Sequence, residues 1–160
     1  MRNFLLICFL QILLCSSMNN NNIYNNIYKN KYEKYKNKYQ NEIEIKELTR
    51  LTSMGFFHYT IKNGEICDYS ENILINKTDY YTMYSTLIHE LTHYLQCIYS
   101  NKMNTNMSSI HNHILPLNTI KFIELVYNKE FWQMEYEAFY YQKNTNEFEK
   151  LETYIKTIYD

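Results

Sequence analysis

The sequence predicts a small α+β domain, in which a short antiparallel or mixed sheet packs on one long helix and further helices follow at the C-terminus. Three patterns support this prediction. Residues rich in β-branched and aromatic side chains flank Asn63-Gly64, a dipeptide typical of hairpin turns. The segment from Asp79 to Tyr99 lacks Gly and Pro and has apolar residues at helical spacing, which recurs between Thr119 and Ile158. A chain of 160 residues is expected to form one such domain.

Residues 1–17 have the features of a secretory signal peptide. Arg2 precedes an apolar run from Phe4 to Cys15, and small residues follow before Met18. The run is too short to cross a bilayer comfortably, so we expect no stable membrane span. The expected location is outside the cell or in the lumen of the secretory pathway. The net charge of −1 gives no general attraction to nucleic acid.

Residues 18–41 form a low-complexity segment of Asn, Tyr and Lys. Tyr and Lys recur at helical spacing, which permits a basic amphipathic helix that binds a partner or a membrane surface. This composition is more typical of solvated segments, and we interpret it as a linker or propeptide. The folded domain is therefore expected to comprise residues 42–160.

Before the long helix, the sequence predicts one short helix and three strands. Ile45, Leu48 and Leu51 are three residues apart, which favours a helix over residues 44–53. β-branched and aromatic residues then predict strands at 56–61, 65–69 and 72–76, the first two joined by the turn at Asn63-Gly64.

After the long helix, residues 101–116 have mostly loop composition and include His111 and His113. Residues 119–128 and 130–143 are predicted to form one kinked helix or two. Apolar residues between Phe148 and Ile158 predict a final amphipathic helix that packs on the core.

The long helix carries two histidines on one face. Asp79 suits the N-cap position. At about 100° per residue, His89, Glu90 and His93 lie on the side opposite the apolar residues. Two histidines four residues apart on a helix can bind one zinc ion, with the intervening glutamate beside the metal-bound water.

The segment His89-Glu90-Leu91-Thr92-His93 resembles the active-site helix of zincin metallopeptidases. Gln96 and Tyr99 stand where the metzincin branch has Gly and a third His, so the chain is more similar to zincins with a glutamate as third ligand. In those proteins the glutamate comes from a later helix, commonly as Glu-x-x-Ala, and Glu135-Tyr136-Glu137-Ala138 resembles that pattern. The resemblance implies Zn²⁺ as cofactor and His89, His93 and Glu135 as its ligands.

Burial gives an independent reason to choose Glu135 as the third ligand. Glu135 lies within an apolar arc of its predicted helix, where an unpaired carboxylate is costly, whereas Glu137 lies outside that arc. Bound zinc would supply the partner that Glu135 needs. Glu137 and the loop histidines His111 and His113 remain alternative ligands.

The resemblance implies a secreted zinc-dependent metallopeptidase, a hydrolase that acts on a peptide or protein substrate. A metal-activated water would attack the peptide carbonyl with Glu90 as general base, and the edge of the sheet would pair with an extended substrate. Two alternatives remain open: a non-catalytic secreted zinc-binding or interaction protein with a zincin-like fold, and a surface module that acts through residues 18–41. Cys67 and Cys97 would remain after signal-peptide removal, and an oxidising compartment would favour a disulfide between them.

Overall fold

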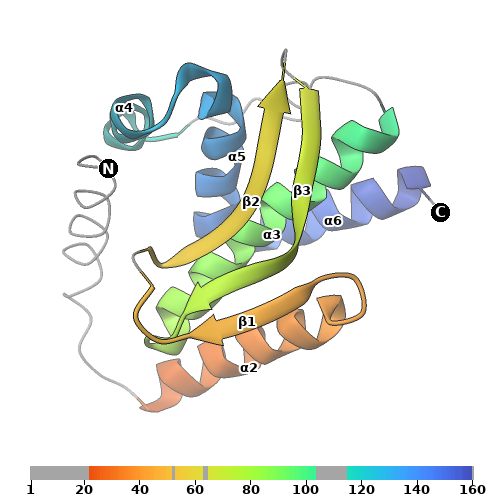
Figure 1. Ribbon diagram of the computed structural model, residues 1–160. Coiled ribbons are helices and arrows are strands. Elements are labelled where there is room, and N and C mark those ends of the chain that lie inside the picture. Colours follow the sequence, from red (N-terminus) through yellow and green to blue (C-terminus); the bar gives the residue numbers. More distant parts are fainter. Residues whose placement is uncertain (1–21, 52, 63–64, 104–114, 160) are drawn as a thin grey trace. The chain divides into compact units, whose positions relative to one another are not determined.

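The computed structural model describes residues 22–51, 53–62, 65–103 and 115–159. Within these ranges the chain contains five α-helices, one short 3-10 helix and a three-stranded mixed sheet of order β1-β3-β2 (Figure 1). The predicted α+β class is confirmed. The predicted signal peptide and the loop histidines His111 and His113 lie outside the described residues.

The described residues belong to two compact units. The first contains those of Met1–Phe56 and Glu71–Leu87, and the second contains those of Phe57–Ser70 and Ile88–Asp160. Each unit has buried apolar residues of its own. The predicted metal ligands His89, His93 and Glu135 belong to the second unit.

Helix α2 (Asn22–Tyr39) belongs to the first unit and corrects the prediction for the low-complexity segment. Tyr32, Tyr35 and Tyr39 are 0%, 2% and 0% exposed. Burying a large apolar side chain contributes about 1.5–3 kcal/mol, so these rings attach the helix firmly to its unit. The prediction of a solvated linker is wrong for residues 22–39, because the helical spacing of the tyrosines outweighs the polar composition.

Strand β1 (Glu44–Leu48) replaces the short helix predicted here. It pairs in parallel with β3, with Glu44 opposite Asn72 and Leu48 opposite Asn76. The Glu47 carboxylate accepts hydrogen bonds from Tyr32 and Lys36 of α2. The predicted helix is wrong because pairing with β3, a contact distant in sequence, outweighs the local spacing.

Strands β2 (Gly55–Lys62) and β3 (Glu65–Asn76) occupy the positions of the predicted hairpin. The two residues of its turn, 63 and 64, lie outside the described residues. The predicted second and third strands form one continuous strand, β3. Because β3 is central, β2 lies at an edge of the sheet.

Helix α3 (Tyr80–Met103) carries the two histidines of the long predicted helix. Asp79 caps it, since its Oδ1 accepts a hydrogen bond of 3.0 Å from the backbone N–H of Thr82. In the second unit Ile88, Leu91 and Leu95 are at most 2% exposed. The apolar face of α3 therefore lies in the core, as its periodicity predicts.

The C-terminal part forms two helices separated by a 3-10 turn, followed by a third helix. Phe139 packs in a cluster with Leu115 and Ile123, and Trp132 Nε1 donates a hydrogen bond of 2.9 Å to the carbonyl of Tyr127. No described helix is both long and apolar enough to cross a membrane. The elements are α4 (Leu117–Val126), η2 (Lys129–Phe131), α5 (Trp132–Lys143) and α6 (Thr145–Tyr159).

Candidate metal centre

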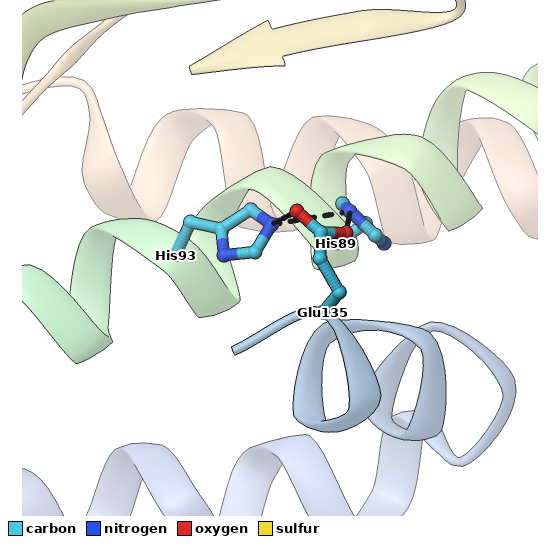
Figure 2. Close-up of side chains that lie close together, drawn as sticks. All are labelled: His89, His93 and Glu135. Carbon is cyan, nitrogen blue, oxygen red and sulfur yellow. Dashed lines mark hydrogen bonds and ion pairs between the residues drawn. The ribbon is translucent and has the colours of Figure 1, made fainter. Parts of the chain in front are cut away.

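His89 and His93 of α3 and Glu135 of α5 come together at one buried point of the second unit (Figure 2). The Nε2 atoms of the two imidazoles are 3.2 Å apart. The two oxygens of Glu135 face one imidazole each, with Oε2 3.5 Å from Nε2 of His89 and Oε1 3.4 Å from Nε2 of His93. The structure thus brings together the three residues that the sequence assigns as metal ligands.

The spacing of these atoms fits a tetrahedral metal ion. Zinc–nitrogen bonds of about 2.0–2.1 Å at the tetrahedral angle separate neighbouring ligand atoms by about 3.3 Å. In addition, Oε2 of Glu135 is buried without a hydrogen-bond partner among the described residues. A buried carboxylate oxygen without a donor is costly, and a cation removes that cost. The group could therefore hold a metal ion.

The charges at this point are strongly coupled. Burial alone would raise the pKa of Glu135, but the charge of His93 and the polar contacts with both imidazoles hold that pKa at about 2. Burial opposes the charged form of His93, yet the nearby Glu135 carboxylate raises the pKa of this imidazole. In the metal-free chain a proton on His93 and the carboxylate of Glu135 stabilise each other, and a bound cation would replace that proton.

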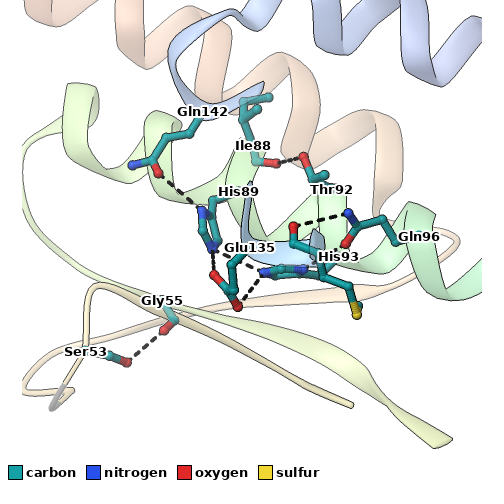
Figure 3. Close-up of polar contacts among 10 residues, drawn as sticks. Ser53, Gly55, Ile88, His89, Thr92, His93, Gln96, Glu135 and Gln142 are labelled. Carbon is teal, nitrogen blue, oxygen red and sulfur yellow. Dashed lines mark hydrogen bonds and ion pairs between the residues drawn. The ribbon is translucent and has the colours of Figure 1, made fainter. Parts of the chain in front are cut away.

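Two glutamine amides contact the Nδ1 atoms of His89 and His93, which face away from Glu135 (Figure 3). Nδ1 of His93 lies 2.9 Å from Oε1 of Gln96, and Nδ1 of His89 lies 3.2 Å from Oε1 of Gln142. Such contacts fix the orientation and tautomer of metal-ligating histidines. Sequence reasoning missed both residues. The position of Gln96, three residues after His93 on the same helix, could have indicated this contact, because side chains at that spacing are neighbours.

Glu137, the alternative third ligand, is buried but has a different partner. Its Oε2 accepts a hydrogen bond of 2.9 Å from Nε2 of Gln96. The described group of potential metal ligands contains His89, His93 and Glu135, without Glu137. Glu135 therefore belongs to the group that could hold a metal ion, whereas Glu137 is connected to His93 through Gln96.

Glu90, the predicted general base, is 8% exposed. Burial raises its pKa, while the imidazoles of His89 and His93 act in the opposite direction. The backbone of Phe57 on strand β2 lies within hydrogen-bonding reach of this carboxylate. A buried carboxylate of raised pKa beside a candidate metal centre is suited to proton transfer.

Two tyrosines face the same group of charges. The ring of Tyr59 on β2 lies 5.2 Å from the imidazole of His93. The hydroxyl of Tyr127 lies within hydrogen-bonding reach of Glu135, and burial, followed by the charges of Glu135 and Glu90, raises the pKa of Tyr127. The sequence contains 18 tyrosines and does not indicate which of them would lie near the predicted metal ligands. Among the described tyrosines, Tyr59 and Tyr127 lie beside the His-His-Glu group.

Cys97 is a free, buried thiol, although it lies one turn beyond His93. Burial raises its pKa, so it remains protonated and is a poor metal ligand. Because Cys97 is a free thiol, the disulfide that the sequence permitted is not formed at Cys97, and the side chain of Cys67 lies outside the part of the chain that the structure describes.

Comparisons of this chain with protein-family models, with curated proteins and with solved structures find no match. The site is accordingly inferred from the arrangement of the His-His-Glu group and from its physical chemistry.

Proposed function

We propose that this chain is a secreted zinc-dependent metallopeptidase with a zincin-like active site. One observation carries the proposal: His89 and His93 of an HExxH helix meet Glu135 of a later helix, with pairwise atomic distances of 3.2, 3.4 and 3.5 Å. Two imidazoles and one carboxylate form a ligand set typical of catalytic zinc, which keeps its fourth position for water or substrate.

Zinc bound by this set would polarise the substrate carbonyl and lower the pKa of its water towards 7. Glu90 is the residue of the chain suited to take the proton from that water and to pass it to the leaving amine. Burial raises the pKa of Glu90 in the metal-free chain, which is the direction that favours proton acceptance. The hydroxyls of Tyr59 and Tyr127 are the candidates to stabilise the developing oxyanion.

Strand β2 supplies a site for an extended substrate. The backbone N–H of His58 donates to Oγ of Ser70 on β3, at 3.3 Å. Because successive N–H groups of a strand point to opposite edges, those of Phe57 and Tyr59 point towards the outer edge of the sheet. Phe57 reaches Glu90 and Tyr59 packs on His93, so this edge runs beside the proposed catalytic residues. A peptide that pairs with β2 would bring its backbone carbonyls to the site.

The test combines zinc content with cleavage of an unfolded protein substrate. Wild type is expected to bind one zinc per chain and to cleave, His93→Ala to lose both properties, and Glu90→Gln to keep zinc but lose turnover. Glu130→Gln, an exposed glutamate of η2, is the matched control and should behave as wild type. Zinc binding without any cleavage by wild type would favour a non-catalytic binding protein and refute the peptidase proposal.

A further inference from the structure

A continuous buried chain of hydrogen bonds lies behind His93. Glu137, Gln96 and His93 are 2%, 1% and 3% exposed. Nε2 of Gln96 contacts Oε2 of Glu137 at 2.9 Å and the carbonyl of Met134 at 3.3 Å, while its Oε1 lies 2.9 Å from Nδ1 of His93. Figure 3 shows Gln96 beside His93, on the side away from Glu135.

The partners of Gln96 determine which way its amide points. The carboxylate of Glu137 and the carbonyl of Met134 can only accept hydrogen bonds. A reversed amide would place its oxygen against both of them, which is repulsive in a buried site. The amide nitrogen therefore faces Glu137, and the amide oxygen faces His93.

This orientation fixes the proton of His93. An amide oxygen accepts a hydrogen bond, so Nδ1 of His93 must carry the proton. The lone pair of the neutral imidazole is then on Nε2, the atom that faces His89 and Glu135. The Glu137 side chain is thus connected through one amide to the tautomer that a metal requires.

We propose that Glu137 and Gln96 are positioning residues that hold His93 in its metal-binding tautomer. The inference rests on the proposed metallopeptidase site and deepens it. Gln96 contacts Nδ1 of His93 rather than the Nε2 that faces the metal position, so both residues act through this imidazole. Gln142 presents the same acceptor to His89 at the longer distance of 3.2 Å.

Exchanging the amide of Gln96 and the carboxylate of Glu137 tests this arrangement. Gln96→Glu would bring a second carboxylate against that of Glu137, and like charges this close are unfavourable in a buried site. Adding Glu137→Gln removes the conflict, because the amide introduced at position 137 would donate to the carboxylate introduced at position 96. That carboxylate would in turn accept from Nδ1 of His93. The exchanged pair preserves the direction of the hydrogen bond on His93, although the roles of amide and carboxylate are reversed.

The experiment uses the full chain and two readouts. Zinc affinity is measured by competition with a chromophoric chelator, and the tautomer of His93 is read from ring ¹⁵N shifts of metal-free protein at alkaline pH. Gln96→Leu and Gln96→Glu are expected to weaken zinc binding by about 10–100-fold. The double variant Gln96→Glu/Glu137→Gln should recover part of that loss in zinc affinity. Recovery should be incomplete because the carbonyl of Met134 would still lack the donor that Gln96 provides. Glu137→Gln alone should add a minor population of the other His93 tautomer, because only the carbonyl of Met134, at 3.3 Å, would then hold the Gln96 amide in its direction.

Leu95→Ala is the matched control, because Leu95 is 2% exposed on the same helix and makes no polar contact through its side chain. It should lower thermal stability while leaving the His93 tautomer unchanged. An unchanged tautomer in Gln96→Leu, or a double variant that binds zinc no better than Gln96→Glu, would overturn the proposal. Wild-type protein that binds no zinc or cleaves nothing would refute the proposed function instead, while the tautomer shifts would still test the role of Gln96 and Glu137.

Discussion

Replacing Glu135 by Gln removes one of the three proposed metal ligands while preserving the shape of the side chain. The carboxylate is 5% exposed and lies between two imidazoles. An amide at this position is a far weaker zinc ligand, since zinc prefers thiolate, imidazole and carboxylate groups. We expect Glu135→Gln to fold and to lose most of its stabilisation by zinc.

The size of the effect can be worked out in two parts. Free zinc at about 100 times its dissociation constant stabilises the folded chain by about 2.7 kcal/mol, or roughly 5–10 °C in Tm for a chain of this size. In the metal-free chain the pKa of Glu135 is lowered from 4.5 to about 2, which corresponds to about 3 kcal/mol of favourable interaction at neutral pH. The variant loses this interaction too. The zinc-induced change in Tm is therefore the informative quantity, rather than Tm itself.

The assay is thermal unfolding of wild type and Glu135→Gln, each with a chelator and with excess zinc. Wild type should show the full zinc-induced rise, and the variant should show a rise of at most about 2 °C, corresponding to under 1 kcal/mol. Glu130→Gln should match wild type. Equal rises in wild type and Glu135→Gln would show that zinc binds elsewhere, and the assignment of Glu135 would have to be withdrawn.

Three other measurements test separate parts of the structure. Burial opposes ionisation of Glu47, but hydrogen bonding to Lys36 lowers the pKa of this carboxyl below 4.5. The ionised carboxylate therefore stabilises the fold above that pH and ceases to do so in acid, so Glu47→Gln should be less stable than wild type by up to about 1 kcal/mol at neutral pH. A urea titration that shows the same difference in acid would contradict this. If Tyr127 stabilises the oxyanion, Tyr127→Phe should lower kcat about 10²-fold or more with little change in KM, whereas Tyr59→Phe should do so only if Tyr59 has that role. Burial lowers the pKa of His93, but the Glu135 carboxylate raises it by more. Zinc should therefore displace a proton from His93 near neutral pH and bind more weakly as the pH falls through the pKa of His93. Calorimetry in two buffers that shows no proton release on zinc binding would contradict this prediction.

The parts of the fold that could be predicted from sequence depend on local signals. Helix α3 has an N-cap at Asp79, uninterrupted periodicity and an apolar face that becomes buried. Strand β2 and the first part of β3 have β-branched and aromatic residues around a turn dipeptide. In each case the residues that specify the element are neighbours in the chain, so the pattern is legible without knowledge of the tertiary contacts.

The two errors arise where distant contacts prevail. In β1, Ile45 and Leu48 have the spacing of a helix, but Ile45 pairs with Ile73 in a parallel ladder. A parallel partner so distant in the chain leaves no local signature. In α2, the aromatic rings that form its buried side occur among Asn and Lys, which are typical of solvated segments. Composition suggested a linker there, whereas the spacing of the tyrosines, taken alone, predicted the helix.

Glu135 and Glu137 are distinguished by their partners rather than by burial. The apolar arc selected Glu135 because a buried carboxylate needs a partner, yet both carboxylates are buried, at 5% and 2% exposure. Helix α5 is enclosed on a wider face than the arc suggested, so the sequence pattern alone does not separate the two. Glu135 meets two imidazoles that can share a cation, whereas Glu137 meets the amide of Gln96.

This difference in partners gives the two carboxylates different physical roles. A carboxylate between two neutral imidazoles keeps an uncompensated buried charge until a proton or a metal ion arrives, so Glu135 favours cation binding directly. A carboxylate that accepts from an amide needs no cation at that contact, and its charge instead fixes the direction of the amide. Under the proposed arrangement, Glu137 would affect a bound metal ion through the orientation of His93. Removing the charge at position 135 should abolish binding, whereas removing it at 137 should only weaken it.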